Sequence, residues 1–226
     1  MRVGGNTLGW YVDFSRDEIG DVLARELYLS AGLNPAVAHG APSVAAAVLG
    51  ESCLQFLPSD ELPCRSLILH DGPRWIIHVR KSLNARQLNH AVAHELGEWF
   101  LRCRGYSEPD IEALSNSVAA AICVPRVAFL AAHRQLGEDL SALSHQFRVS
   151  ESLMVLRIAE CLGAPTALIT EKVVLTRGGP REWPTTRQGW TALVGHVRAR
   201  ANGMVVRRLS DAPGRLVMRL RDLDVP

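Results

Sequence analysis

The sequence has 226 residues, 47% of them hydrophobic, and its 25 Lys and Arg against 23 Asp and Glu leave a formal net charge of +2. This length suits one large or two small domains, and this hydrophobic share allows a buried core. Dedicated nucleic-acid-binding proteins usually have a large excess of basic residues, and this small net charge argues against that class.

The compartment follows from cysteine usage and from the apolar runs. Five cysteines are widely spaced and none forms a C-x-x-C pair, so neither a disulfide framework nor a thiolate zinc site is indicated. No apolar run reaches the roughly 20 residues that span a bilayer, and the first residues lack the apolar core of a signal peptide. We therefore expect a soluble, cytoplasmic protein with no membrane contact.

The residue pattern in the first third of the chain predicts two helices and three strands. Ser15 can cap a helix in which Ile19, Val22, Leu23 and Leu27 recur at helical spacing. A second short helix is expected to run through Val48 and to end at Gly50. Residues 53–57 read as a strand, and two apolar runs within 66–79 flank an Asp-Gly-Pro turn, which indicates a hairpin. His70 and His78 alternate with apolar neighbours there, as half-exposed packing residues do.

The remaining chain is mostly helical up to about residue 165. Helices are expected over 84–102 and 110–122. A third helix is expected to run through Leu130, and two short helices are expected at 140–147 and 150–163. Beyond residue 165, segments 173–175, 204–208 and 216–220 read as strands. The predicted fold class is α+β: a mainly helical core over 1–170 with a small sheet, followed by a small β-rich region over 171–226.

The helix over 84–102 carries a row of side chains that can bind a metal. His90, His94 and Glu98 are four residues apart, so they share one helix face at a spacing of about 6 Å along the axis, with Glu95 at the edge of the row. In zinc peptidases, an H-E-x-x-H helix supplies two histidine ligands and a glutamate general base. Here Glu98 stands at the second histidine position.

Two frames of this motif are possible. The frame His94-Glu95-x-x-Glu98 keeps Glu95 as general base and makes His94 and Glu98 the metal ligands, and we prefer it for a hydrolase. A carboxylate ligand still binds zinc, although it shifts the preference toward Mn or Fe. The other frame pairs His90 with His94 and leaves Ala91 at the position of the base. His90 could also be an extra ligand or contact a ligand.

A third ligand is expected from the next helix. Glu112 could reach the metal, and Asn116, one turn further on, could hydrogen-bond a ligating imidazole and fix its tautomer. The same residues are also compatible with an ordinary solvated helix face, because histidine and glutamate are common on such faces.

The arrangement from about Asp17 to Thr170 resembles the ImmA/IrrE family of bacterial and phage metallopeptidases. Members show an opening helix, a hairpin with an Ile-Ile-like strand, and a helix reading Ala-His-Glu-Leu-Gly-His; here Trp75 to Val79 is followed by Ala93-His94-Glu95-Leu96-Gly97-Glu98. The family's next helix reads roughly E-x-x-A-N-x-F-A-A-x-L-L-M-P, which Glu112 to Pro125 matches in register and length. A helix-turn-helix-like segment, 140–163, completes the match.

The resemblance implies a cytoplasmic zinc endopeptidase that cleaves a DNA-binding repressor and so derepresses an operon or a prophage. His94 and Glu112 would be metal ligands and Glu95 the general base. The departure at Glu98 motivates an alternative, a catalytically inactive relative that acts as a protein-binding regulator. The segment 140–163 lacks an arginine-rich recognition face, so we expect it to pack or to contact a protein rather than to bind DNA directly.

Overall fold

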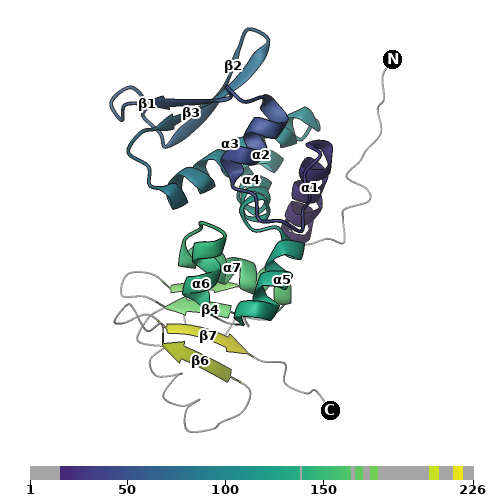
Figure 1. The fold of residues 1–226 in the computed structure, drawn as a ribbon, viewed down its shortest axis with the longest axis vertical. Coiled ribbons are helices and arrows are strands. Elements are labelled where there is room, and N and C mark those ends of the chain that lie inside the picture. Colours follow the sequence, from purple (N-terminus) through teal and green to yellow (C-terminus); the bar gives the residue numbers. More distant parts are fainter. Residues whose placement is uncertain are drawn as a thin grey trace. The chain divides into compact units, whose positions relative to one another are not determined.

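The computed structural model describes residues 16–137 and 139–163 and four strands at 166–169, 174–177, 204–208 and 216–220. The chain divides into two compact units, one formed by residues up to 135 with 145–149, the other by 136–144 with the residues from 150 onward. Figure 1 shows the elements of both. The mainly helical α+β class predicted from the sequence is confirmed. The predicted boundary at residue 170 stays a prediction.

The first unit contains the helices and the small sheet that the sequence predicted. Its elements are α1 (Arg16–Ser30), α2 (Ala41–Leu49), β1 (Leu54–Leu57), β2 (Ser66–Asp71), β3 (Arg74–Arg80), α3 (Ala85–Cys103), α4 (Glu108–Cys123) and α5 (Arg126–Leu136). The helix expected at 110–122 begins two residues earlier, with Pro109 in its first turn, where a missing N–H costs nothing. The proposed cap Ser15 lies outside the described residues.

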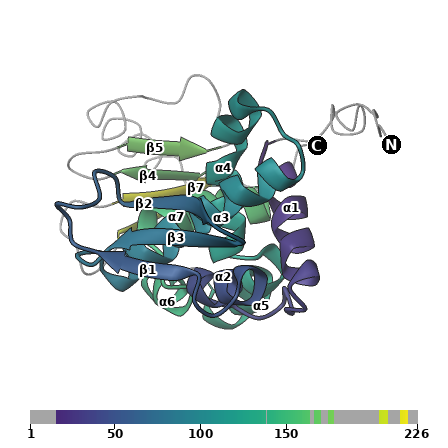
Figure 2. The same ribbon diagram turned by 90° about the horizontal axis from the view of Figure 1, so that it is seen from above.

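The three-stranded sheet has β3 at its centre, as Figure 2 shows. β2 pairs with β3 in the antiparallel hairpin that the Asp-Gly-Pro turn predicted, and Gly72 in this turn adopts a positive φ of 58°. β1 pairs with β3 in parallel. Ile77 and Val79 of β3 are fully buried, whereas His70 is exposed and His78 is half-buried. β2 is an edge strand, and it lies next to α3.

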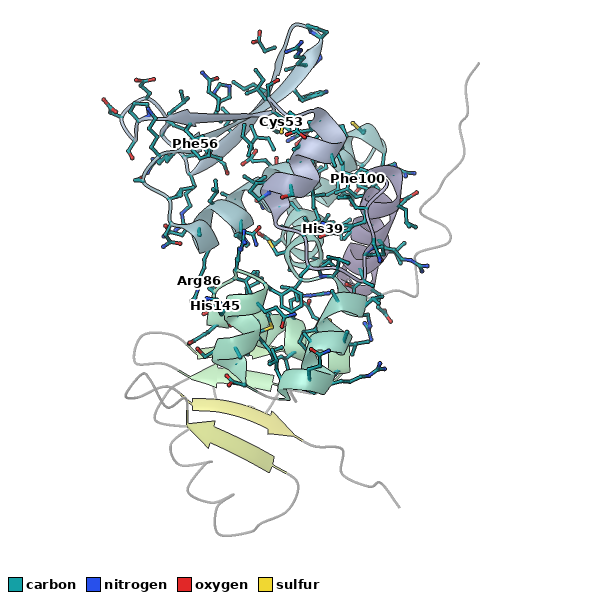
Figure 3. The ribbon with its side chains drawn as sticks, in the orientation of Figure 1. His39, Cys53, Phe56, Arg86, Phe100 and His145 are labelled. Atoms are coloured by element: carbon teal, nitrogen blue, oxygen red, sulfur yellow. The ribbon has the colours of Figure 1, made fainter. Side chains whose placement is uncertain are left out.

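The core of the first unit lies between α1, α3, α4 and the inner face of the sheet. Phe100 of α3 is buried, whereas Phe56 of β1 is 45% exposed; both are labelled in Figure 3. α1 and α4 approach so closely at Gly20 that a Cβ there would lie 2.8 Å from the carbonyl carbon of Ser117. Tyr28 donates a hydrogen bond from its hydroxyl to the Ile122 carbonyl at 2.8 Å. Contrary to its predicted place on the apolar face of the helix, Val22 is 43% exposed.

The second unit joins a helix to an antiparallel sheet. α7 (Glu151–Leu162) begins at Ser150, whose hydroxyl accepts a hydrogen bond from the Leu153 amide, and it ends before Gly163 in the left-handed conformation. It contacts β4 (Thr166–Ile169) and β5 (Val174–Arg177). The strand order is β5-β4-β7-β6, with β6 at Met204–Arg208 and β7 at Leu216–Leu220. β4 is the strand that the sequence pattern did not predict.

α6 (Leu140–Gln146) is the first of the two short helices predicted near residue 140. With α7 it confirms the helix pair of the 140–163 segment as secondary structure. Among the described residues, no single helix has the length and apolar character to cross a membrane; α4 and α5 meet these criteria only when counted together, across a bend of 49°.

Candidate functional site

α3 is fixed at its N-terminal end by a capping box. The Asn84 side chain accepts hydrogen bonds from the Arg86 and Gln87 amides at 3.1 and 3.0 Å, and the Gln87 side chain accepts one from the Asn84 amide at 3.0 Å. This reciprocal arrangement satisfies amide groups that a helix start leaves unpaired. The first turn of the site helix is therefore well defined.

One turn further along, Asn89 fixes the helix to two other parts of the first unit. This side chain is 2% exposed. Its Oδ1 accepts from the Ala41 amide at 2.7 Å, and its Nδ2 donates to the Phe147 and Arg148 carbonyls at 3.2 and 3.3 Å. Asn89 thus joins the start of α2, the helix α3 and the segment after α6, and it holds the predicted site row in place.

The predicted row His90, His94, Glu98 does lie along one face of α3. The rings of His90 and His94 are stacked, with centroids 6.4 Å apart and an interplanar angle of 16°. His94 Nε2 lies 3.1 Å from Glu98 Oε1. Burial, together with the neighbouring His94 and Arg65, lowers the pKa of His90, so His90 favours the neutral imidazole.

Arg102 extends this row by one further turn. Its Nη1 lies 3.1 Å from Glu98 Oε2, and its Nε lies 3.4 Å from Glu108 Oε1 at the start of α4. Both carboxylate oxygens of Glu98 are therefore engaged, one by His94 and the other by Arg102. The guanidinium supplies positive charge where Glu98 replaces a histidine, and it also links α3 to α4.

Glu95, the predicted general base, is turned toward the sheet. It is 6% exposed. Ser66 Oγ donates to its Oε1 at 2.8 Å, and the Ile68 amide donates to its Oε2 at 2.9 Å. Its pKa is raised, because burial outweighs these two hydrogen bonds and because Glu98 is near. Glu95 thus satisfies a backbone N–H on the free edge of β2, where an unpaired amide would be costly.

Two further candidate site residues stand on α4. Glu112 and Asn116 are both exposed on α4. Within the described ranges, no three His, Cys, Asp or Glu side chains come together in a way that could hold a metal ion. The structure therefore brings His94 and Glu98 together, with His90 beside them, and Glu112 completes no three-ligand group with them.

The donors as placed do not fit a three-ligand metal centre. A zinc site of the peptidase type needs three protein ligands and an open position for water. Here Glu98 is engaged on both oxygens, Glu95 is hydrogen-bonded to β2, and Glu112 completes no three-ligand group with the described residues. His94 Nδ1 is buried and has no hydrogen-bond partner, but it meets no further ligand-type side chains of the kind that a metal requires. The ligand roles assigned to His94, Glu98 and Glu112 stay predictions.

Sequence reasoning missed four partners in the site. Arg102 had a usable signal, since Glu followed four residues later by Arg is a favourable pairing on a helix. Ser66 and Ile68 had none, because they reach Glu95 only once β2 packs beside α3. Glu108 is likewise brought to Arg102 by the turn between the two helices.

Comparisons with known proteins place part of the chain in a family. Residues 58–159 match the IrrE N-terminal-like domain of peptidase family M78. A solved structure of a Mycobacterium tuberculosis transcriptional regulator is similar in fold, with a TM-score of 0.55 and 13% sequence identity, over 94% of this chain and 78% of that one. No protein with a curated description matches the chain.

Proposed function

The chain belongs to the ImmA/IrrE family through its IrrE N-terminal-like domain, and we propose that this peptidase-type domain works as a protein-binding regulator rather than as a zinc endopeptidase. The observation that carries the proposal is the state of Glu98. Its two oxygens are held by His94 and Arg102 at 3.1 Å each.

Electrostatics explains why this arrangement disfavours a metal. A divalent cation beside Glu98 would lie close to the Arg102 guanidinium, and like charges at such separations repel by several kcal/mol at an effective dielectric constant of about 20. Binding would therefore require Glu98 to give up Arg102. It would also require a third donor, and neither His90, whose ring stacks on that of His94, nor another described residue completes a three-ligand group as placed.

The position of Glu95 supports the same proposal. A general base must come within hydrogen-bonding reach of the water it activates. Both carboxylate oxygens of Glu95 instead accept hydrogen bonds from β2. The residue that the motif would assign to catalysis is used here to hold a sheet edge against a helix.

The proposed partner is a DNA-binding repressor, the class of protein on which the family resemblance implies action. A domain that keeps the family's fold can keep a protein-binding surface after its metal ligands change, since fold and site chemistry are separable. The mycobacterial structure of similar fold is described as a transcriptional regulator. Regulation through binding alone needs neither metal nor hydrolysis.

One observation favours the second candidate, a metal-dependent endopeptidase with Zn, or with Mn or Fe. His94 Nε2 and Glu98 Oε1 lie 3.1 Å apart, a separation at which two donors can share one ion. This candidate requires Glu98 to exchange Arg102 for the metal and a third donor to approach.

Metal content separates the two candidates. The full chain would be purified after exposure to Zn, Mn or Fe(II), and its bound metal measured by mass spectrometry beside His94→Ala and Glu95→Gln variants. We expect far less than one metal per chain in all three. One equivalent of metal bound per wild-type chain, lost in His94→Ala and kept in Glu95→Gln, would establish a metal centre and overturn the proposal.

A genetic comparison tests the regulatory role itself. A strain lacking the protein would be complemented with the wild-type chain or with Glu95→Gln, and the two transcriptomes compared. Glutamine can accept from the Ile68 amide and donate to Ser66, so the fold is kept. We expect equal complementation, whereas a peptidase would lose its activity, and Glu95→Gln would then resemble the deletion.

A further inference from the structure

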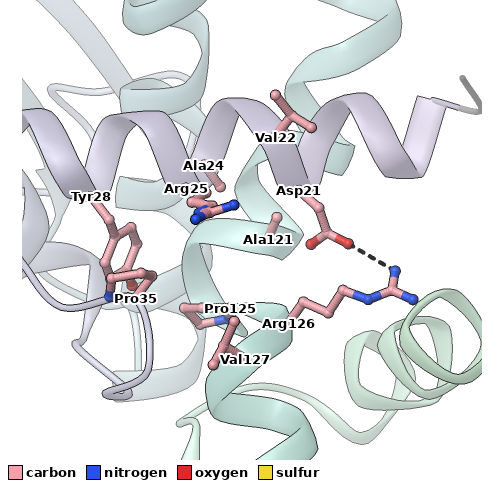
Figure 4. Close-up of a pocket in the computed structure, with 10 residues that line it drawn as sticks. All are labelled: Asp21, Val22, Ala24, Arg25, Tyr28, Pro35, Ala121, Pro125, Arg126 and Val127. Atoms are coloured by element: carbon pink, nitrogen blue, oxygen red, sulfur yellow. Dashed lines mark hydrogen bonds and ion pairs between the residues drawn. The ribbon is translucent and has the colours of Figure 1, made fainter.

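A pocket of about 210 Å³ opens between α1, the junction of α4 with α5, and the loop at Pro35 (Figure 4). It lies within the first unit, and none of its lining residues belongs to the α3 row. A cavity of about 150 Å³ is enough to hold benzene, while drug-sized ligands need about 300 Å³ or more. This pocket therefore suits one ring or a short chain.

Aliphatic side chains form the mouth of the pocket. Val22 and Val127 both line it, and they are 43% and 51% exposed. Tyr28 lies deeper, with its hydroxyl already donated to the Ile122 carbonyl, so it presents its ring to the pocket and has no free donor. Apolar surface left open beside a concave wall is typical of a binding site.

The rim of the pocket carries a surplus positive charge. Arg126 Nη1 lies 3.4 Å from Asp21 Oδ2, so this pair is close to neutral. Arg25 is exposed, and within the part of the chain that the structure describes no carboxylate pairs with it. Figure 4 shows its guanidinium between Tyr28 and the Asp21–Arg126 pair. An unpaired guanidinium presents a fork of N–H donors that fits a carboxylate.

The walls are held rigidly before any ligand arrives. The close approach of Gly20 to Ser117 fixes the distance between α1 and α4. Pro35 and Pro125, each with a restricted backbone, line two other sides. A preformed pocket spares a ligand the cost of ordering its site.

We propose that this pocket binds a small carboxylic acid with an apolar tail. The tail lies between Val22 and Val127 against the ring of Tyr28, and the carboxylate pairs with Arg25. The size of the cavity restricts the tail to about six carbons or one ring. This proposal is independent of the regulatory function, because it uses no residue of the α3 row.

Binding is tested on the full chain with three probes: hexanoate, hexan-1-ol and acetate. Titration followed by NMR of the valine methyl groups reports on Val22 and Val127 directly. We expect hexanoate to shift the methyl signals of both valines. Hexan-1-ol should bind about tenfold more weakly, because it loses one charge-assisted hydrogen bond. Acetate, which lacks the apolar tail, should not bind. Absence of hexanoate shifts, or equal affinity for hexan-1-ol, would overturn the proposal.

Paired variants locate the binding. Arg25→Gln should weaken hexanoate about tenfold and leave hexan-1-ol unchanged, while Arg86→Gln, an exposed arginine on α3, should change neither. Val127→Glu places a carboxylate at the exposed mouth and should abolish hexanoate binding. Its control, Leu69→Glu, alters a residue of similar exposure on β2. Hexanoate binding that survives both Arg25→Gln and Val127→Glu would place the acid elsewhere and overturn the proposal.

Discussion

Two polar clusters stand on α3 within a few turns of one another, and they behave differently. Asn89 is buried and makes three hydrogen bonds that join distant segments. The row of His94, Glu98 and Arg102 is partly exposed, with side chains 30%, 20% and 39% accessible. The first cluster is costly to change because water cannot replace its bonds. The second is screened by solvent, so each of its ion pairs contributes little to the free energy of unfolding.

Glu95 stands between these two extremes. It belongs to the candidate site by its place in the motif, yet it is as buried as the core and is bonded to β2. A residue of a catalytic motif can therefore serve the fold, here by binding the edge of a sheet.

Replacing Asn89 with Ala should destabilise the protein most. The Ala41 amide and the carbonyls of Phe147 and Arg148 lose their partner inside the protein, which we expect to cost about 3 kcal/mol in the free energy of unfolding. Urea denaturation measures this change. Asn116→Ala is the matched control, since Asn116 is exposed, and its effect should stay within about 0.5 kcal/mol. Equal effects of the two variants would show that Asn89 is not a structural junction.

Glu95→Ala should cost about 2 kcal/mol, because the Ile68 amide and the Ser66 hydroxyl lose their acceptor. Glu95→Gln should cost less. The ratio of the two, measured by urea denaturation, separates the hydrogen bonds of Glu95 from its charge. A larger loss in Glu95→Gln than in Glu95→Ala would contradict the role assigned to these hydrogen bonds.

The pH dependence of Glu95 has a defined sign. Its folded-state pKa is raised above the ordinary value of 4.5, so folding favours its protonated form. The stabilisation is fully present below pH 4.5 and is lost as the pH rises through the folded pKa. As the pH rises through the folded-state pKa, the free energy of unfolding of the wild type should therefore fall relative to that of Glu95→Gln. A difference that stays constant with pH would show that the pKa is not raised.

The pair of Glu98 and Arg102 should contribute least. A double-mutant cycle with Glu98→Gln and Arg102→Met should give a coupling of about 0.5 kcal/mol, since partly exposed pairs on helices are screened by solvent. Raising the salt concentration should reduce it further. A coupling above about 2 kcal/mol would show that the row is as structural as Asn89.

Secondary structure was largely predictable because its signals are local. The capping of α3 by Asn84, the Asp-Gly-Pro turn of the hairpin and the stop at Gly50 lie within a few residues of the boundaries they set. β4 was missed, although β1, which has the same length, was predicted. The exposure of Val22 was missed because helical spacing predicts which residues share a helix face, but not which part of that face other elements cover.

The candidate site was predictable only in part. Spacing alone places His90, His94 and Glu98 on one face of α3, because a helix has a fixed pitch. Spacing could not show which way the Glu95 carboxylate turns, since this depends on β2 packing beside the helix. Nor could it show that Glu112 stays exposed, because that depends on the rotation of α4 about its own axis.

The sequence alone predicted the order of the helices and of every strand except β4, the row of possible metal ligands on α3 and the resemblance to the ImmA/IrrE family. Each of these rests on interactions between residues near one another in the chain. The tertiary structure decided the partners of Glu95 and Glu98, the junction at Asn89 and the pocket beside Arg25. These depend on how separate elements pack, and packing is set by the summed burial of many side chains rather than by any local motif.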